Sequence, residues 1–138
     1  MKKLASLCAA TALAAIPSLA CTSLIATPGA SADGSSMITY AADSHTLYGE
    51  LYHQPAADHA PGAMRKVVDW DSGRLLGEIP EVPHTYATIG NMNEHGLTIA
   101  ESTWSGRAEL EGSGMIDYGS LIYITLQRAK TAREAIEV

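Results

Sequence analysis

The sequence predicts an α+β fold in which strands come first along the chain and helices come last. Two observations support this prediction. Between residues 21 and 103, short β-prone segments alternate with turns built from Gly, Pro, Asn and Asp. From residue 117 onward, apolar residues recur at helical spacing instead. We therefore expect helices packed on a mostly antiparallel sheet.

The first 20 residues have the pattern of a removable export signal. Two lysines begin it, residues 4–16 form an apolar segment, and residues 17–20 end in small side chains. Cleavage after Ala20 would make Cys21 the first residue of a chain of 118 residues, which is enough for one small domain. We thus expect a signal peptide at 1–20 and a mature segment at 21–138.

Three hairpins are predicted in order. Residues 21–27 and 36–42 form the first, around a loop with two glycine turns, and a polar, irregular stretch follows at 43–63. Residues 65–70 and 74–78 flank a turn at 71–73. After two prolines, residues 85–92 and 97–103 flank a tight turn at 93–96. These pairings would place residue 43 beside Cys21, because antiparallel neighbours end next to each other's beginnings.

Two helices are predicted after the strands. Residues 117–130 show apolar spacing, with one face formed by Leu121, Ile122, Thr125, Leu126 and Ala129. Thr131 and Glu134 form a capping-box pattern, so a second helix should begin near Thr131. The sequence stops at Val138 without a Gly, Asn or Pro stop signal. We interpret residues 21–138 as the N-terminal part of a longer domain.

Composition and spacing argue against several kinds of partner. Without the signal, seven basic side chains face fifteen acidic ones, a formal charge of −8 that disfavours nucleic acid as a partner. No later apolar run reaches the length of about 18 residues that indicates a membrane span. The five histidines show no metal-binding spacing and have no cysteine partner, so neither a metal nor another cofactor is expected. A homo-oligomer is left open.

Cys21 is the strongest candidate for chemistry. As a terminal residue it would carry a thiol with a pKa of about 8.5 and an α-amine with a pKa of about 7.7–8.0. Such an amine can take the thiol proton, which is the nucleophile-and-base pairing of covalent catalysis. The alternative is a lipid anchor on this cysteine. Lipoprotein signals usually have leucine three places earlier, where this chain has Ser18.

Two further residues are candidates for the same site. Asp43 ends the second predicted strand, where its carboxylate could orient the amine of Cys21; a turn-capping role is the alternative. Thr103 ends the last predicted strand, where its N–H or hydroxyl could stabilise an oxyanion. The alternative is a threonine that only ends a strand.

Six segments together resemble the dipeptidase A family, the secernin-related cysteine peptidases that use an N-terminal nucleophile. They are residues 21–23, 32–35, 37–44, 91–97, 100–104 and 126–135. The likeness is in order over nearly the whole mature segment. The family is similar in turn to bile salt hydrolases and penicillin V acylases.

The resemblance implies the αββα sandwich of N-terminal-nucleophile hydrolases, of which only the N-terminal part would be present. It implies an exported dipeptidase with small peptides as substrates, Cys21 as nucleophile, Asp43 near the amine and Thr103 at the oxyanion hole. Tyr40 stands where the acylase relatives have an arginine. Two alternatives remain open: an amidase acting on non-peptide amides, and a lipid-anchored binding protein. We expect a periplasmic or extracellular location, in preference to a lipoprotein.

Overall fold

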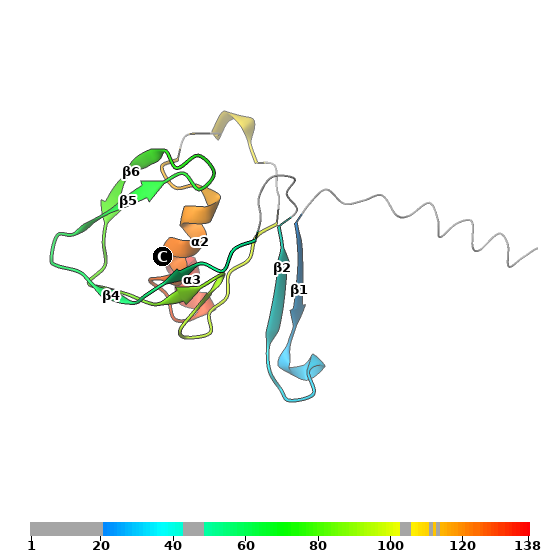
Figure 1. The fold of residues 1–138 in the computed structure, drawn as a ribbon. Coiled ribbons are helices and arrows are strands. Elements are labelled where there is room, and N and C mark those ends of the chain that lie inside the picture. Colours follow the sequence, from blue (N-terminus) through cyan, green and yellow to red (C-terminus); the bar gives the residue numbers. More distant parts are fainter. Residues whose placement is uncertain (1–20, 43–48, 103–105, 111, 113) are drawn as a thin grey trace, which may run out of the picture.

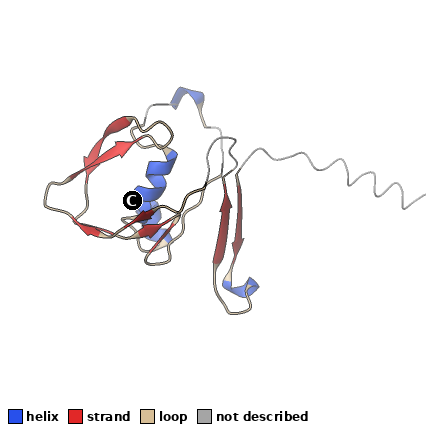
Figure 2. Ribbon diagram, viewed as in Figure 1, coloured by secondary structure: helices blue, strands red, loops and turns tan. Residues whose placement is uncertain are grey.

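The computed structural model describes residues 21–42, 49–102, 106–110, 112 and 114–138, and it has an α+β architecture (Figure 1). The strands lie in the first two thirds of this part of the chain and the α-helices at its end (Figure 2). The strands are β1 (Thr22–Ala26), β2 (Met37–Ala41), β3 (His53–Gln54), β4 (Ala57–Asp58), β5 (Met64–Val68), β6 (Leu75–Pro80), β7 (His84–Thr85), β8 (Thr88–Ile89) and β9 (Met92–Asn93). The helices are η1 (Pro28–Ala30), η2 (Ala108–Leu110), α2 (Tyr118–Leu126) and α3 (Ala132–Glu137).

All pairings among these strands are antiparallel. β1 pairs with β2, β4 with β7, and β5 with β6, while β3, β8 and β9 form a three-stranded sheet in that order. The short strands β3 and β4 fall in the stretch predicted to be irregular. The α+β prediction is confirmed, but the sheets are small and separate.

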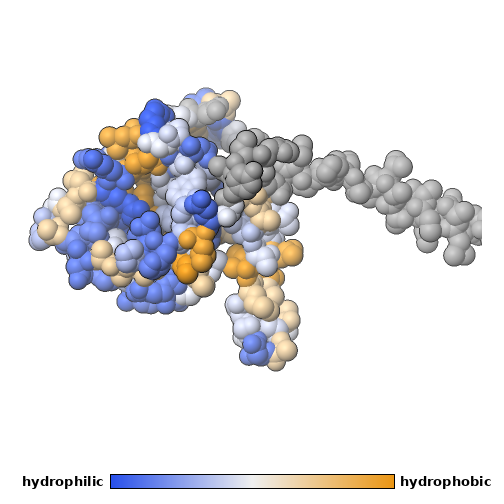
Figure 3. Space-filling view, viewed as in Figure 1, coloured by the Kyte–Doolittle hydropathy of each residue, from blue (hydrophilic) through white to orange (hydrophobic). Residues whose placement is uncertain are grey.

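The first predicted hairpin is confirmed as β1 and β2, with Thr22 opposite Ala41 and Ala26 opposite Met37. This pair projects as an arm from the rest of the molecule (Figure 1). Leu24 and Ile25 are 67% and 71% exposed, and apolar residues mark the surface of the arm (Figure 3). The arm therefore gains little stability from apolar burial of its own.

The second predicted hairpin is confirmed as β5 and β6. Its turn is closed by the Asp69 N–H, which donates to the Arg74 carbonyl oxygen at 2.8 Å. The Asp69 carboxylate accepts from the backbone N–H of Ser72 at 2.9 Å. Gly73 has a φ of 70°, a conformation that glycine adopts without a steric penalty.

The third predicted hairpin is only partly correct. Its turn is present, since the Asn93 N–H donates to the Leu97 carbonyl oxygen at 2.9 Å. The first strand is broken, however, because Gly90, with a φ of 50°, reverses the chain and pairs β8 with β9. Residues 97–102 form no strand; one bridge joins Thr98 to Met92.

The predicted helix 117–130 is shorter than expected. Asp117 caps α2, accepting from the Ser120 N–H at 3.0 Å, but the helix ends at Leu126. The buried Asn93 side chain donates to the carbonyl oxygens of Leu126 and Ala129, at 2.8 and 2.7 Å. These contacts satisfy carbonyl groups at the C-terminal end of α2 without further helical turns.

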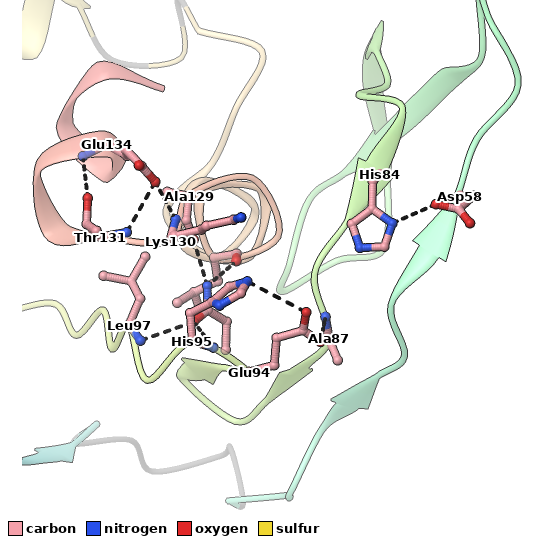
Figure 4. A network of polar contacts seen from close by, with 12 residues as sticks. Asp58, His84, Ala87, Glu94, His95, Leu97, Ala129, Lys130, Thr131 and Glu134 are labelled. Atoms are coloured by element: carbon pink, nitrogen blue, oxygen red, sulfur yellow. Dashed lines mark hydrogen bonds and ion pairs between the residues drawn. The ribbon is translucent and has the colours of Figure 1, made fainter.

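The predicted second helix is confirmed as α3. Thr131 accepts from the Glu134 N–H, and the Glu134 carboxylate accepts from the Thr131 N–H, which completes the capping box (Figure 4). Both contacts lie at the start of the helix, where backbone N–H groups lack helical partners.

The core lies between α2 and the segment that follows the third turn. Its buried members are Leu97, Ile122, Leu126 and Ala129, and Ile99 and Ala135 pack against them. Thr125, on the predicted helix face, is buried as expected, but Leu121 is 58% exposed. None of the helices in the described ranges combines the length and the hydropathy needed to cross a bilayer.

Candidate functional site

Cys21 lies directly before β1 and is half-buried. Two hydrogen bonds join this end of β1 to residues 101–102. The Ser102 hydroxyl donates to the Cys21 carbonyl oxygen at 3.4 Å, and the Ser23 hydroxyl donates to the Glu101 carbonyl oxygen at 3.3 Å. The base of the arm is therefore attached to the body of the molecule beside Cys21.

Tyr40 connects the cysteine to a carboxylate. In the β1–β2 register Tyr40 lies opposite Ser23, so its side chain shares a face with Cys21, two residues before Ser23. The Tyr40 hydroxyl donates to the Glu101 Oε1 atom at 2.8 Å. A thiol, a phenol and a carboxylate thus adjoin one another at the start of β1.

Burial raises the pKa of the Tyr40 phenol, and the hydrogen bond to Glu101, the charge of Glu101 and the adjacent Cys21 side chain raise it further. This contribution of Cys21 agrees with the β1–β2 register, which places the two side chains on the same face. Tyr40 therefore stays protonated throughout the neutral range and remains a hydrogen-bond donor.

A cavity of about 380 Å³ lies beside Tyr40 and Glu101. Five of the thirteen described residues that line it are aromatic. The Trp70 ring stacks on Tyr123 with centroids 4.8 Å apart, and Tyr52 meets Trp70 edge-on at 5.4 Å. The described residues that line it are Tyr40, Ala42, Gly49, Glu50, Tyr52, Trp70, Gly90, Asn91, Glu101, Tyr118, Gly119, Ile122 and Tyr123.

The wall is fixed by contacts between α2 and the β5–β6 hairpin. The Trp70 N–H donates to the Asp117 carboxylate at 2.7 Å, and the Tyr118 hydroxyl donates to Asp71 at 2.8 Å. At position 119 only glycine fits, because a Cβ atom there would lie 2.7 Å from the Trp70 ring. Burial, and after it the hydrogen bond to Asp71, raises the pKa of Tyr118.

Of the three predicted site residues, the structure describes Cys21. Asp43 and Thr103 lie outside the described residues, as does the expected signal at 1–20. Their neighbours in sequence do converge: Ala42 follows the residue that pairs with Thr22, and Ser102 bonds to Cys21. The described residues next to Asp43 and Thr103 thus lie close to Cys21.

Glu101 is a site residue that the sequence patterns do not predict. Tyr40 was noted only as a departure from the acylase pattern, and its partner lies 61 residues away in the sequence. One signal was present: Glu101 follows the mostly apolar residues 97–100 and stands two places before Thr103. A carboxylate at that position would be expected on the same side of an extended chain as Thr103.

Two of the histidines that the structure describes are in contacts away from the cavity. His84 Nδ1 lies 2.6 Å from the Asp58 carboxylate (Figure 4), and His59 Nε2 lies 3.0 Å from the Thr85 hydroxyl. Neither histidine lines the cavity. Within the described ranges no three His, Cys, Asp or Glu side chains are grouped so that they could hold a metal ion.

The chain matches the model of a known protein family. The family model described as peptidase family C69 matches residues 48–138, which is 91 of the 138 residues. The match includes most of the cavity wall and Glu101, but it begins after β2 and does not include Cys21 or Tyr40. No curated protein and no solved structure matches the chain significantly.

Proposed function

Because the chain belongs to peptidase family C69, we propose that it is an exported cysteine-type dipeptidase whose nucleophile is Cys21. Membership of the family makes the protein a peptidase. Export, the dipeptide substrate and the role of Cys21 as the first residue of the mature chain are parts of the proposal. The observation that carries it is the position of Cys21, half-buried beside Tyr40 at the edge of an aromatic cavity.

The proposed reaction is acyl transfer to sulfur. The α-amine of Cys21 takes the thiol proton, and the thiolate attacks the peptide carbonyl carbon to form a tetrahedral oxyanion. The protonated amine then gives its proton to the departing amino group as the C–N bond breaks. Water, deprotonated by the same amine, hydrolyses the thioester and restores the thiol. The cycle consumes one water for each peptide bond.

The surroundings of the thiol support the amine as the base. Tyr40 holds its proton toward Glu101, and among the described residues no Lys, Arg or His lines the cavity. To act as a nucleophile, the Cys21 thiol needs a group that accepts its proton. The terminal amine, on the same residue, is the nearest candidate.

We propose that Asp43 orients this amine and that Thr103 donates to the oxyanion. Their neighbours Ala42 and Ser102 both lie at the start of β1, which supports these roles. In this interpretation the β1–β2 arm begins one sheet of an αββα sandwich of the N-terminal-nucleophile type, of which residues 21–138 are the N-terminal part. The observed α+β architecture is compatible with that fold.

The test is the dipeptidase activity of the exported protein with Cys21 replaced. Cys21→Ala should lower kcat by about three orders of magnitude or more, as loss of a nucleophile does in other hydrolases. Cys8→Ser, in the expected signal, is the matched control and should leave kcat unchanged. A fully active Cys21→Ala variant would refute the mechanism. Higher activity on acyl-amino acids than on dipeptides would instead favour an amidase.

Processing is tested separately by intact mass. The exported protein should begin at unmodified Cys21, and iodoacetamide should add a single carbamidomethyl group. A lipid adduct on the Cys21 sulfur would leave no free thiol, and a chain that retains residues 1–20 would leave no terminal amine at Cys21. Either result would favour the lipid-anchored or unprocessed alternatives over the dipeptidase.

A further inference from the structure

We propose that the aromatic cavity beside Tyr40 binds an ammonium group of the substrate, with Glu101 as its counter-charge. The inference deepens the proposed function, because it relies on that function for the substrate being a peptide. It adds a recognition site and a chemical class of ligand. The observations that carry it are the composition of the wall, its charge, and the way in which Glu101 is held.

The wall presents aromatic faces that solvent can reach. Trp70, Tyr52 and Tyr118 are each only partly buried although they pack against neighbours. Aromatic rings attract cations through the negative potential of their faces. An enclosure of this kind accommodates both an alkyl stem and a positively charged head group.

The charge of the cavity is negative. Glu50 and Glu101 line it, and its described lining includes no Lys or Arg. Asp71 and Asp117 lie just behind the wall, bonded to Tyr118 and to the backbone of Trp70. The pKa of Tyr118 is raised by the negative charges of Asp71, Glu101 and Asp117. The electric fields of these three carboxylates therefore act on the same part of the cavity wall. An anionic ligand would be repelled there.

Glu101 is held in a fixed orientation. Its Oε1 atom accepts from Tyr40 at 2.8 Å, and its backbone carbonyl accepts from Ser23. The Oε2 atom has no hydrogen-bond partner among the described residues. A carboxylate with one oxygen fixed and the other available is suited to accept a charged N–H donor. Since Tyr40 also contacts Cys21, a cation bound there would lie near the scissile bond.

Two groups of a peptide supply this chemistry, the terminal α-ammonium and a lysine side chain. Three related probes separate them. L-norleucine amide carries only the α-ammonium, N-acetyl-lysine amide only the side-chain ammonium, and N-acetyl-norleucine amide carries neither. Binding is measured by titration calorimetry at pH 6.5. At this pH the α-amine of the probe stays protonated, since the pKa of such an amine is about 7.7–8.0.

The experiment uses the full chain in a Cys21→Ala background, where binding does not depend on catalysis. At least one cationic probe should bind about tenfold or more tightly than the neutral probe, and which one does so identifies the source. A second substitution, Glu101→Gln, should remove the preference for the cationic probe. The matched control Glu78→Gln, on the exposed side of β6, should retain that preference.

Three results would overturn the proposal: equal affinity for all three probes, preference unchanged by Glu101→Gln, or cation affinity that does not fall with added salt. The salt dependence needs no variant and so remains decisive if Glu101→Gln does not fold. Failure of the nucleophile test with success here would leave a cation-binding site whose catalytic residue is not Cys21. If Cys21→Ala abolishes activity but the cationic probes show no preference, Cys21 remains the proposed nucleophile and only the ammonium site is refuted.

Discussion

Tyr40 is the residue that joins the candidate nucleophile to the cavity. Its hydroxyl bonds to Glu101 and interacts with Cys21, and its ring forms part of the cavity wall. A residue with three such contacts couples the position of the carboxylate to that of the thiol.

The raised pKa of Tyr40 predicts a loss of stability in alkali. A phenol whose folded pKa lies above the unfolded value of 10.0 adds stability that is complete below pH 10 and is lost as pH rises further. The free energy of unfolding should therefore decline above pH 10, and Tyr40→Phe should make that decline shallower. Urea unfolding at pH 8 to 11 measures this.

Tyr118→Phe is the companion variant, because the pKa of Tyr118 is raised as well, by burial and by Asp71. Each substitution should flatten part of the alkaline decline, and the double variant should flatten it more than either. An unchanged decline in the double variant would contradict the assigned causes.

At the scale of elements, Asn93 ties the third turn to the end of α2. Its side chain donates to two carbonyl oxygens there, and its own oxygen accepts from the N–H groups of His95 and Leu97, both at 3.1 Å. Four hydrogen bonds from one buried amide fix the turn and the helix end together.

Asn93→Ala should destabilise the protein by about 2–4 kcal/mol, because it leaves buried carbonyl and N–H groups without partners. Asn91→Ala, which removes a single hydrogen bond to Ile99, should cost only about 1 kcal/mol. Chemical denaturation of both variants measures the difference. Equal losses would mean that the buried groups find new partners.

Gly119 sets the approach of α2 to the cavity wall. Gly119→Ala should displace the Trp70 ring, weaken its stacking on Tyr123 and destabilise the fold by about 1–3 kcal/mol. Gly29→Ala, where a Cβ atom meets nothing within 4 Å, should change stability by less than about 0.5 kcal/mol. Near-ultraviolet circular dichroism and urea unfolding report both effects; an undisturbed Trp70 signal in Gly119→Ala would contradict the packing.

The elements that sequence analysis predicted well are those with local signals. The first two hairpins and the capping box at Thr131 depend on residues within a few places of one another, and all are present. The end of α2 depends on contacts with Asn93, and the strand that ends at Gly90 pairs with β3; both partners are distant in sequence. Such tertiary contacts override local propensity.

The same distinction applies to the site. Cys21 was found from a local processing pattern, whereas the Tyr40–Glu101 contact spans 61 residues and has no local signature. The aromatic residues of the cavity wall also come from four separate parts of the chain: Tyr40, Tyr52, Trp70 and helix α2. Nothing in the spacing of these aromatic residues predicts that they meet.

At the scale of the whole molecule, stability rests on the small core around α2. Leu126 is 0% exposed within that core, whereas Leu121, on the same helix, is 58% exposed. The β1–β2 arm contributes no buried large hydrophobic side chain to it.

Leu126→Ala should therefore lower the free energy of unfolding by about 2–5 kcal/mol, through lost burial and the cavity left behind. Leu121→Ala is the matched control and should cost less than about 1 kcal/mol, because most of its side chain already meets water. Thermal or urea unfolding of the pair distinguishes them. Similar losses would show that the face of α2 bearing Leu121 is covered in solution.

Among the described residues, the hydrogen bonds that attach the arm to the body lie near one end of it, at Ser23, Tyr40 and Ser102. Because the arm is held at its base, the amplitude of its thermal motion should increase from Cys21 toward the loop at residues 27–36. Amide hydrogen exchange would then be slowest at the base of the ladder and fastest at its tip. Cys21 lies at the base of the arm, where the backbone should move less than at the far end.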